Sequence, residues 1–101
     1  MRIKPGVELG LVQPQAIVAL IIANQIWQQL GYDLVWTSGN EHSDKRVPDT
    51  LHNVGQAIDL RTRYFSKTEL IQASSRLKTS LGESFDVVVY DTHIHIEYDP
   101  K

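Results

Sequence analysis

Two short segments of the sequence hold residues that could bind a metal ion together. The first runs from Thr50 to Asp59 and carries His52 and Asp59, while the second carries His93 and His95. Two neutral imidazole nitrogens and one carboxylate form a familiar ligand set for catalytic zinc, and three protein ligands leave a fourth position for water. Zinc lowers the pKa of bound water to about 7 and polarises a carbonyl group, which are the two tasks of amide hydrolysis.

Each segment also has a simpler interpretation when it is taken alone. In a strand, His93 and His95 would share one face while the isoleucines beside them pack on the other, so the imidazoles could simply be exposed or hydrogen-bonded. His52 on a loop and Asp59 capping a turn would need no metal either. A turn at Gly55, where glycine tolerates a positive φ, would instead bring imidazole and carboxylate together. A metal-free domain with structural histidines therefore stays open as an alternative.

The elements that must position these residues begin with a helix from about Pro14 to Leu30. Proline suits the first helical position because its missing N–H would be unpaired there, and Gly31 can supply the left-handed residue after the helix. Residues 16–23 are all apolar. This pattern predicts a helix that is buried on more than one side.

A second helix and four strands complete the expected fold. Ser66 and Glu69 have the spacing of a capping box, an apolar stripe follows them, and Gly82 ends the helix. The turn at Asp91 and Thr92 is short enough to join two strands tightly. The pattern predicts an α+β domain in which two helices pack against a small, mostly antiparallel sheet. The expected strands are Asp33–Thr37, Ala57–Arg61, Phe85–Tyr90 and His93–Tyr98.

Length and composition exclude several classes of protein. The 101 residues predict one domain, spanning residues 1–101, and a net charge of -2 argues against nucleic acid as a partner. The longest apolar run is far shorter than the roughly 20 residues of a membrane span. No cysteine is present, so thiolate metal sites are excluded. Arg2 and Lys4 precede the apolar run as in a signal peptide, but Glu8 and Pro14 argue against one, and no signal is favoured.

The two motif segments, taken together, resemble those of a known group of zinc proteins. Thr50 to Asp59, followed by His93-Ile94-His95, is similar to the pattern Ser-x-His-x-x-Gly-x-Ala-x-Asp with a later His-x-His. This pattern belongs to the zinc D-Ala-D-Ala carboxypeptidase, L-alanyl-D-glutamate endopeptidase and hedgehog group, and the longer stretches resemble its small phage and prophage members. The resemblance implies a hedgehog/DD-peptidase-like fold, a Zn²⁺ cofactor and hydrolysis of an amide bond in peptidoglycan stem peptides. Which of the two bonds is cut stays open.

The resemblance also implies a role for individual residues. His52, Asp59 and His95 correspond to the zinc ligands, and His93 would stand beside the metal to hold substrate or stabilise an oxyanion. An alternative for Asp59 is to accept a hydrogen bond from a ligand histidine. Many members of the group place an acidic general base three residues before the last ligand; Thr92 occupies that position here, so Asp91 becomes the candidate base. Its carboxylate would need to lie within about 3 Å of its proton, directly or through one water.

Two further features bear on the substrate and on a second interpretation. Glu97 would share the ligand face but lie about 7 Å beyond His95 along the strand, which makes it a weaker candidate for the base. The arginine that usually follows the Ser-Gly turn is missing, so Arg46, Arg61 or Arg63 could bind a substrate carboxylate instead. Because the acidic residue is shifted from position 92 to Asp91 and the usual arginine is missing, an alternative is a catalytically inactive zinc-binding module, such as a phage structural or partner-binding protein. The sequence leaves the localisation open; the resemblance to small phage proteins implies synthesis in a host cytoplasm with release to the cell wall, or association with a virion.

Overall fold

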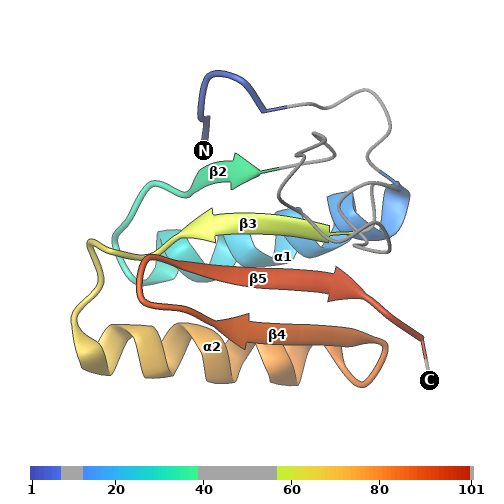
Figure 1. Ribbon diagram of the computed structural model, residues 1–101. Coiled ribbons are helices and arrows are strands. Elements are labelled where there is room, and N and C mark those ends of the chain that lie inside the picture. The colour runs from blue at the N-terminus through green and yellow to red at the C-terminus, as the bar shows by residue number, and fades with distance from the viewer. Residues whose placement is uncertain (8–12, 39–56, 101) are drawn as a thin grey trace.

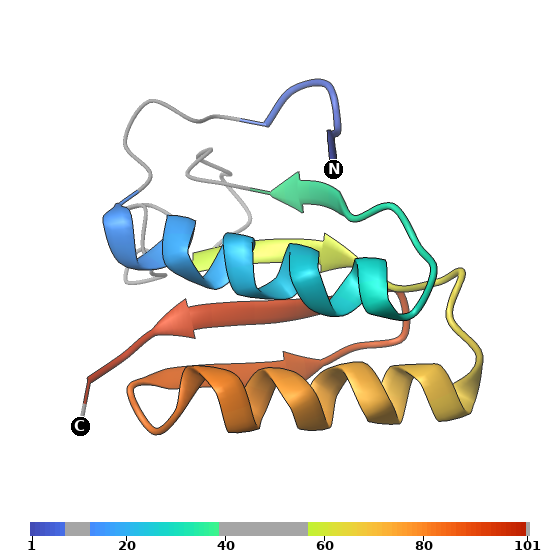
Figure 2. The ribbon, with the colours of Figure 1, turned by 180° about the vertical axis from the view of Figure 1, so that it is seen from behind.

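The computed structural model describes residues 1–7, 13–38 and 57–100, which form two layers. One layer is a five-stranded sheet, and both helices lie on the same face of it (Figure 1 and, from behind, Figure 2). The strand order is β1-β2-β3-β5-β4. In chain order the elements are β1 (Arg2–Ile3), α1 (Pro14–Gln29), β2 (Val35–Ser38), β3 (Ala57–Arg61), α2 (Lys67–Leu81), β4 (Phe85–Val89) and β5 (His93–Tyr98).

The sheet is mixed, with antiparallel pairs in the majority. β1 pairs with β2 in parallel, whereas the pairs β2–β3, β3–β5 and β5–β4 are antiparallel. β5 therefore lies between β3 and β4, which α2 connects along the chain. The predicted α+β class, the two helices and the mostly antiparallel sheet are confirmed. The two-residue strand β1 was not expected, because two residues are too few to show an alternating pattern.

The first helix begins as the sequence predicts but is buried on one side only. Pro14 lies in its first turn, and Gly31 follows its end with a φ of 88°. Ile17, Val18 and Ile21 are 37, 49 and 55% exposed, so the prediction of burial on more than one side is wrong. The physical reason is that only one stripe of the helix meets the rest of the described protein. The buried residues of that stripe are Ala16, Ala19, Leu20, Ala23, Ile26 and Trp27.

The second helix carries the capping box that its sequence predicts. The Ser66 hydroxyl accepts a hydrogen bond from the Glu69 backbone N–H at 3.1 Å, and the Glu69 carboxylate accepts one from the Ser66 backbone N–H at 2.8 Å. Tyr32, which follows α1, donates its hydroxyl proton to the same carboxylate at 2.7 Å. Gly82 ends the helix with a φ of 76°. The cap thus fixes both the start of α2 and its contact with the segment after α1.

The hydrophobic core lies between the sheet and the helices. Alternation along β3 and β5 directs Ile58, Leu60, Ile94 and Ile96 into this core, where they are almost fully buried. Trp27 of α1 is also fully buried, and its indole N–H donates to the Tyr64 hydroxyl at 3.0 Å. The residues that alternate with them, such as Asp59 in β3 and His95 in β5, must consequently point to the opposite side of the sheet. No helix in the described part of the chain is both long enough and apolar enough to cross a membrane.

Candidate functional site

The sheet surface opposite the helices gathers most of the candidate residues. Strand register places Asp59 of β3 opposite His95 of β5, and Arg61 opposite His93. On the other side of β5, Asp86 of β4 lies opposite Glu97. Directly opposed residues point to the same side of a sheet, so these side chains share one surface. We call this surface the far face; its polar members on the three strands are Asp59, Arg61, Asp86, His93, His95 and Glu97.

Asp59 and His95 meet at the centre of the far face. The Asp59 Oδ1 and His95 Nδ1 atoms are 2.8 Å apart, and only 11% of the Asp59 side chain and 14% of the His95 side chain are exposed. The Thr37 hydroxyl of β2 donates to the Asp59 backbone carbonyl at 3.2 Å, which ties the neighbouring strand to this point. The resemblance implied that these two residues meet, although their spacing in the sequence does not show it; the antiparallel pairing of β3 with β5 brings them together.

The second ring nitrogen of His95 has a carboxylate partner as well. Its Nε2 atom lies 2.6 Å from Oε1 of Glu97, two residues further along β5. Carboxylates only accept hydrogen bonds, so this arrangement favours a proton on both ring nitrogens. Burial lowers the pKa of His95, but the hydrogen bonds and negative charges of Asp59 and Glu97 outweigh burial and raise that pKa above its ordinary value.

This arrangement fits a zinc site built on Asp59 and His95. Tetrahedral zinc with bonds of about 2.0–2.2 Å holds two ligand atoms about 3.3 Å apart, so the observed pair would need to open by only about 0.5 Å. Histidines that bind metals usually donate their other ring N–H to a carboxylate or carbonyl, which is the position of Glu97. The third ligand expected from the sequence, His52, lies outside the described residues. The predicted ligands Asp59 and His95 are thus brought together, and Glu97 joins them.

The two residues predicted for catalysis lie on the side of His95 away from Glu97. His93 is the next residue of β5 on the far face, about 7 Å from His95 by strand rise. Its Nδ1 atom is 3.1 Å from the Thr92 hydroxyl, and its ring stacks on Tyr90 with centroids 4.8 Å apart. Asp91 is exposed in the turn between β4 and β5, and is therefore farther from His95 than His93 is.

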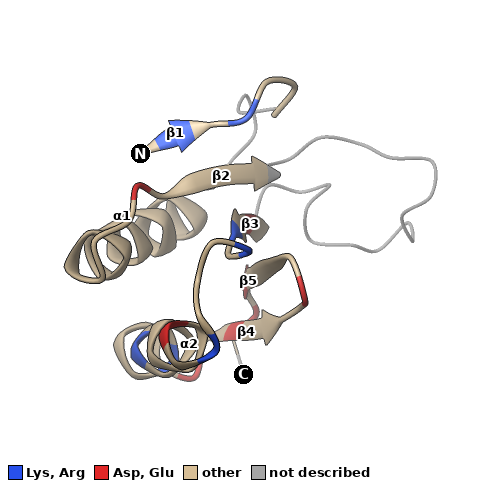
Figure 3. Ribbon diagram, turned by 90° about the vertical axis from the view of Figure 1, so that its left-hand side faces the viewer, with Lys and Arg blue, Asp and Glu red and all other residues tan. Residues whose placement is uncertain are grey.

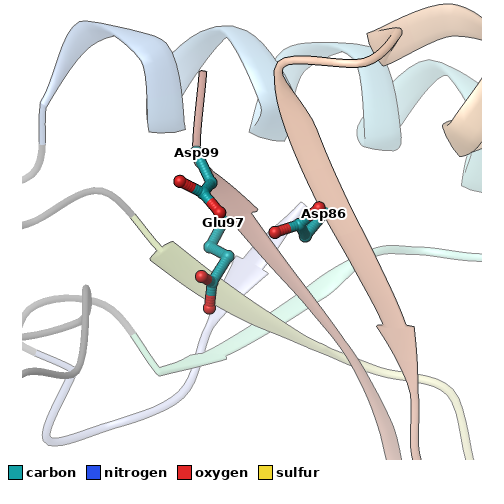
Figure 4. A group of neighbouring side chains, drawn as sticks. All are labelled: Asp86, Glu97 and Asp99. Atoms are coloured by element: carbon teal, nitrogen blue, oxygen red, sulfur yellow. The ribbon is translucent and has the colours of Figure 1, made fainter. Parts of the chain in front are cut away.

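A group of carboxylates adjoins the Glu97 side of the site. One oxygen each from Asp86, Glu97 and Asp99 lies within 4.8 Å of the others (Figure 4). Such a group could bind a metal ion, and an all-oxygen ligand set suits Ca²⁺ or Mg²⁺ better than zinc. Exposed acidic groups are also common without an ion. Sequence reasoning missed this cluster, because it depends on the register that places Asp86 opposite Glu97.

Positive charge gathers on the opposite side of His95. A pocket of about 230 Å³ is lined by Lys4, Thr37, Arg61, Arg63, Thr92 and His93. We call it the basic pocket; Figure 3 shows the lysine and arginine residues of this region after β1 and along β3. Arg61 and Arg63 were among the arginines that the sequence indicated for a substrate carboxylate, whereas Lys4 was not. Arg46 lies outside the described residues.

Sequence comparison does not assign these features to a known protein. Protein-family models and curated proteins were both searched with the sequence, and neither search finds a match. The far face itself therefore holds what indicates a function. Its three parts, in chain order along β5, are the basic pocket, the Asp59–His95 pair and the carboxylate group of Asp86, Glu97 and Asp99.

Proposed function

We propose that this protein is a zinc-dependent peptidase that hydrolyses an amide bond of peptidoglycan stem peptides, with a fold of the hedgehog/DD-peptidase type. The observation that carries the proposal is the pair of Asp59 Oδ1 and His95 Nδ1, 2.8 Å apart and largely buried. Its support is the order of the two motif segments in the sequence and the carboxylate on the second nitrogen of His95. Release to a cell wall from a host cytoplasm, or transport in a virion, belongs to the same proposal.

In this proposal His52, Asp59 and His95 hold the zinc ion. When bound, zinc supplies a Lewis acid for the scissile carbonyl and lowers the pKa of a water molecule. Glu97 accepts a hydrogen bond from Nε2–H of His95, which fixes the tautomer and directs Nδ1 toward Asp59. Because Asp59 and His95 are largely buried, little bulk water competes for their lone pairs.

His93 and Asp91 are the proposed catalytic residues. Because the Thr92 hydroxyl lies beside Nδ1 of His93, the Nε2 atom is the one that can donate to a substrate oxygen. Asp91 would accept the proton of the attacking water, and Glu97 competes for this role because it already contacts His95. Comparing Asp91→Asn with Glu97→Gln at saturating zinc decides between them: the variant of the true base loses turnover per bound zinc ion.

The proposal is tested on the zinc-loaded protein with muropeptides and with short peptides that end in D-Ala-D-Ala. We expect one zinc per chain and hydrolysis that falls about 1,000-fold in His95→Ala, since a loss of about 4 kcal/mol in barrier lowering corresponds to that factor. His52→Ala should behave alike, and Glu83→Gln, an exposed residue after α2, is the matched control. Absence of stoichiometric zinc, or no hydrolysis above the His95→Ala background, would contradict the proposal.

A zinc-binding module without catalysis is the second candidate, and the position of Asp91 favours it. Asp91, the candidate base, lies in the β4–β5 turn, so His93 stands between it and His95 along the chain. Thr92 occupies the position three residues before His95 at which many members of the zinc peptidase group have their acidic residue. Such a module would act as a phage structural or partner-binding protein. The Thr92→Asp variant tests it: hydrolysis that appears only in this variant shows that the natural chain binds zinc but lacks its base.

A further inference from the structure

We propose that the basic pocket binds the free carboxylate of a peptide whose scissile bond lies at Asp59 and His95. The enzyme would then release one or two residues from a peptide's C-terminus and act as a carboxypeptidase. This inference rests on the proposed function, because it takes the Asp59–His95 pair as the reacting centre. It goes further by naming a substrate end and the residues that recognise it: Lys4, Arg61 and Arg63.

Among the described residues, the positive charge of the pocket is not balanced by a carboxylate. Lys4, Arg61 and Arg63 line one space of about 230 Å³, and no carboxylate among the described residues forms an ion pair with any of them. Arg2 differs, because its Nε atom pairs with Asp33 at 3.0 Å. Three neighbouring cations repel one another, and a bound anion relieves that repulsion. Arginine also matches a carboxylate with two parallel hydrogen bonds.

The pocket lies a short distance along the sheet from the proposed reacting centre. Arg61 is two residues along β3 from Asp59, which corresponds to about 7 Å. A peptide residue in extended form spans about 3.3–3.6 Å. A carboxylate held by Arg61 would therefore lie one or two residues from a carbonyl held at Asp59 and His95. If the enzyme cut a bond far from the C-terminus of a peptide, no free carboxylate would reach the pocket to pair with its positive charge.

The other end of the far face carries the opposite charge. Asp86, Glu97 and Asp99 lie on the opposite side of His95 from Arg61. A peptide carboxylate placed there would be repelled by three acidic groups. The two ends of the far face thus favour a single direction for the bound peptide, with its C-terminus in the basic pocket.

The test measures binding to the zinc-free protein, so it does not depend on turnover. N-acetyl-D-alanine, which has a free carboxylate, is compared with N-acetyl-D-alaninamide, which has none, by NMR titration. We expect the acid to bind at least about 10-fold more tightly, because a hydrogen bond to a charged group contributes about 1.5–3 kcal/mol. Side-chain N–H signals of Arg61 and Arg63 should shift. Equal affinity for the acid and the amide would overturn the proposal.

Variants show whether the preference comes from this pocket. Arg61→Gln with Arg63→Gln should reduce the acid-over-amide preference to less than about 2-fold, because the ion pairs with the carboxylate are lost. The matched control is Arg76→Gln on α2, an exposed arginine bonded to Gln29, which should leave the preference unchanged. If the half-buried Arg61 proves necessary for folding, Lys4→Gln with Arg63→Gln replaces it, since both residues are exposed. A preference that survives these variants would overturn the assignment.

Two further results separate this inference from the proposed function. If the acid binds through Arg61 and Arg63 but no peptide is hydrolysed, the peptidase proposal fails and the carboxylate site stands. If peptides with amidated C-termini are cleaved as fast as the free acids, the peptidase stands and the carboxylate site fails. Inorganic phosphate serves as a competing anion: binding as tight as that of N-acetyl-D-alanine would show a general anion pocket and overturn the assignment to a peptide.

Discussion

The two faces of strands β3 and β5 differ sharply although they are built from alternating residues of the same segments. On the helix side, Ile58, Leu60, Ile94 and Ile96 are almost fully buried among apolar side chains. On the far face, Asp59 and His95 form a buried polar pair next to Glu97. One face therefore accounts for much of the packing, and the other holds the candidate site. Because neighbouring residues serve different ends, substitutions one position apart should have separable effects.

The largest effect is expected from a cavity on the helix side. Leu60→Ala should lower the free energy of unfolding by about 2–5 kcal/mol, because Leu60 is fully buried and the surrounding core closes only partly over the lost volume. Urea denaturation measures the change. The adjacent Asp59→Asn should cost much less stability while abolishing stoichiometric zinc binding. Comparable losses of stability in the two variants would contradict the division between the faces.

An intermediate effect is expected at Glu97. Glu97→Gln should weaken zinc binding about 10–100-fold, because the carboxylate that orients His95 is lost while the ligand atoms remain. Competition with a chelating dye measures the affinity, and Glu83→Gln is the control. An unchanged affinity would show that Glu97 does not orient the metal ligand.

A smaller effect concerns pH and the metal-free protein. The pKa of His95 is raised in the folded state, so its protonation stabilises the fold. This contribution is present below about pH 6.5, the unfolded value, and is lost as the pH rises through the raised folded pKa. The free energy of unfolding should therefore fall with rising pH more steeply in the wild type than in His95→Gln. Parallel curves from pH 6 to 9 would refute this.

Zinc should reverse the sign of that dependence. A histidine must lose its Nδ1 proton before a metal can bind there, so zinc affinity should decrease as the pH is lowered. Calorimetric titrations at several pH values would show it. Without zinc, the Nδ1 proton of His95 stabilises its contact with Asp59. With zinc, the metal ion would replace that proton.

The smallest effect is expected on strand β4. Val88 lies opposite His95 on the far face and is 40% exposed, so Val88→Thr should change the free energy of unfolding by less than about 0.5 kcal/mol. Val87 packs against the core, and Val87→Thr should cost more because it places a hydroxyl among apolar groups. Thermal melts of the two variants provide the comparison. Equal melting temperatures of the two variants would show that β4, unlike β3 and β5, does not have one buried face and one tolerant face.

The sequence predicted the local features of the fold well. The alternation in β5 indicated that its histidines share the side opposite Ile94 and Ile96, and the structure confirms this. Ser66 and Glu69 likewise form the capping box that their spacing indicated. These features depend on neighbours within a few residues, which a sequence pattern records directly.

Residue spacing alone could not predict features that depend on pairing between distant segments; only the resemblance implied that Asp59 and His95 meet. The contact of Asp59 with His95 follows from a register set across 36 positions, with α2 and β4 between them. The contact of Glu97 with His95 needs a long side chain to fold back along its strand, and strand rise alone made it too distant. The exposure of Ile17, Val18 and Ile21 shows a related limit, because an apolar pattern does not reveal how many neighbours a helix has.

The order of strands has a consequence for how the protein is made. β5 is translated after β3 and β4, yet it lies between them in the sheet. In a nascent chain, the edges of β3 and β4 that pair with β5 therefore have no partner strand until residues 93–98 leave the ribosome. The same strand brings His95 and Glu97 to Asp59. Closure of the sheet and assembly of the Asp59–His95 pair therefore become a single event that must wait for β5, and a product that stops before β5 would lack both.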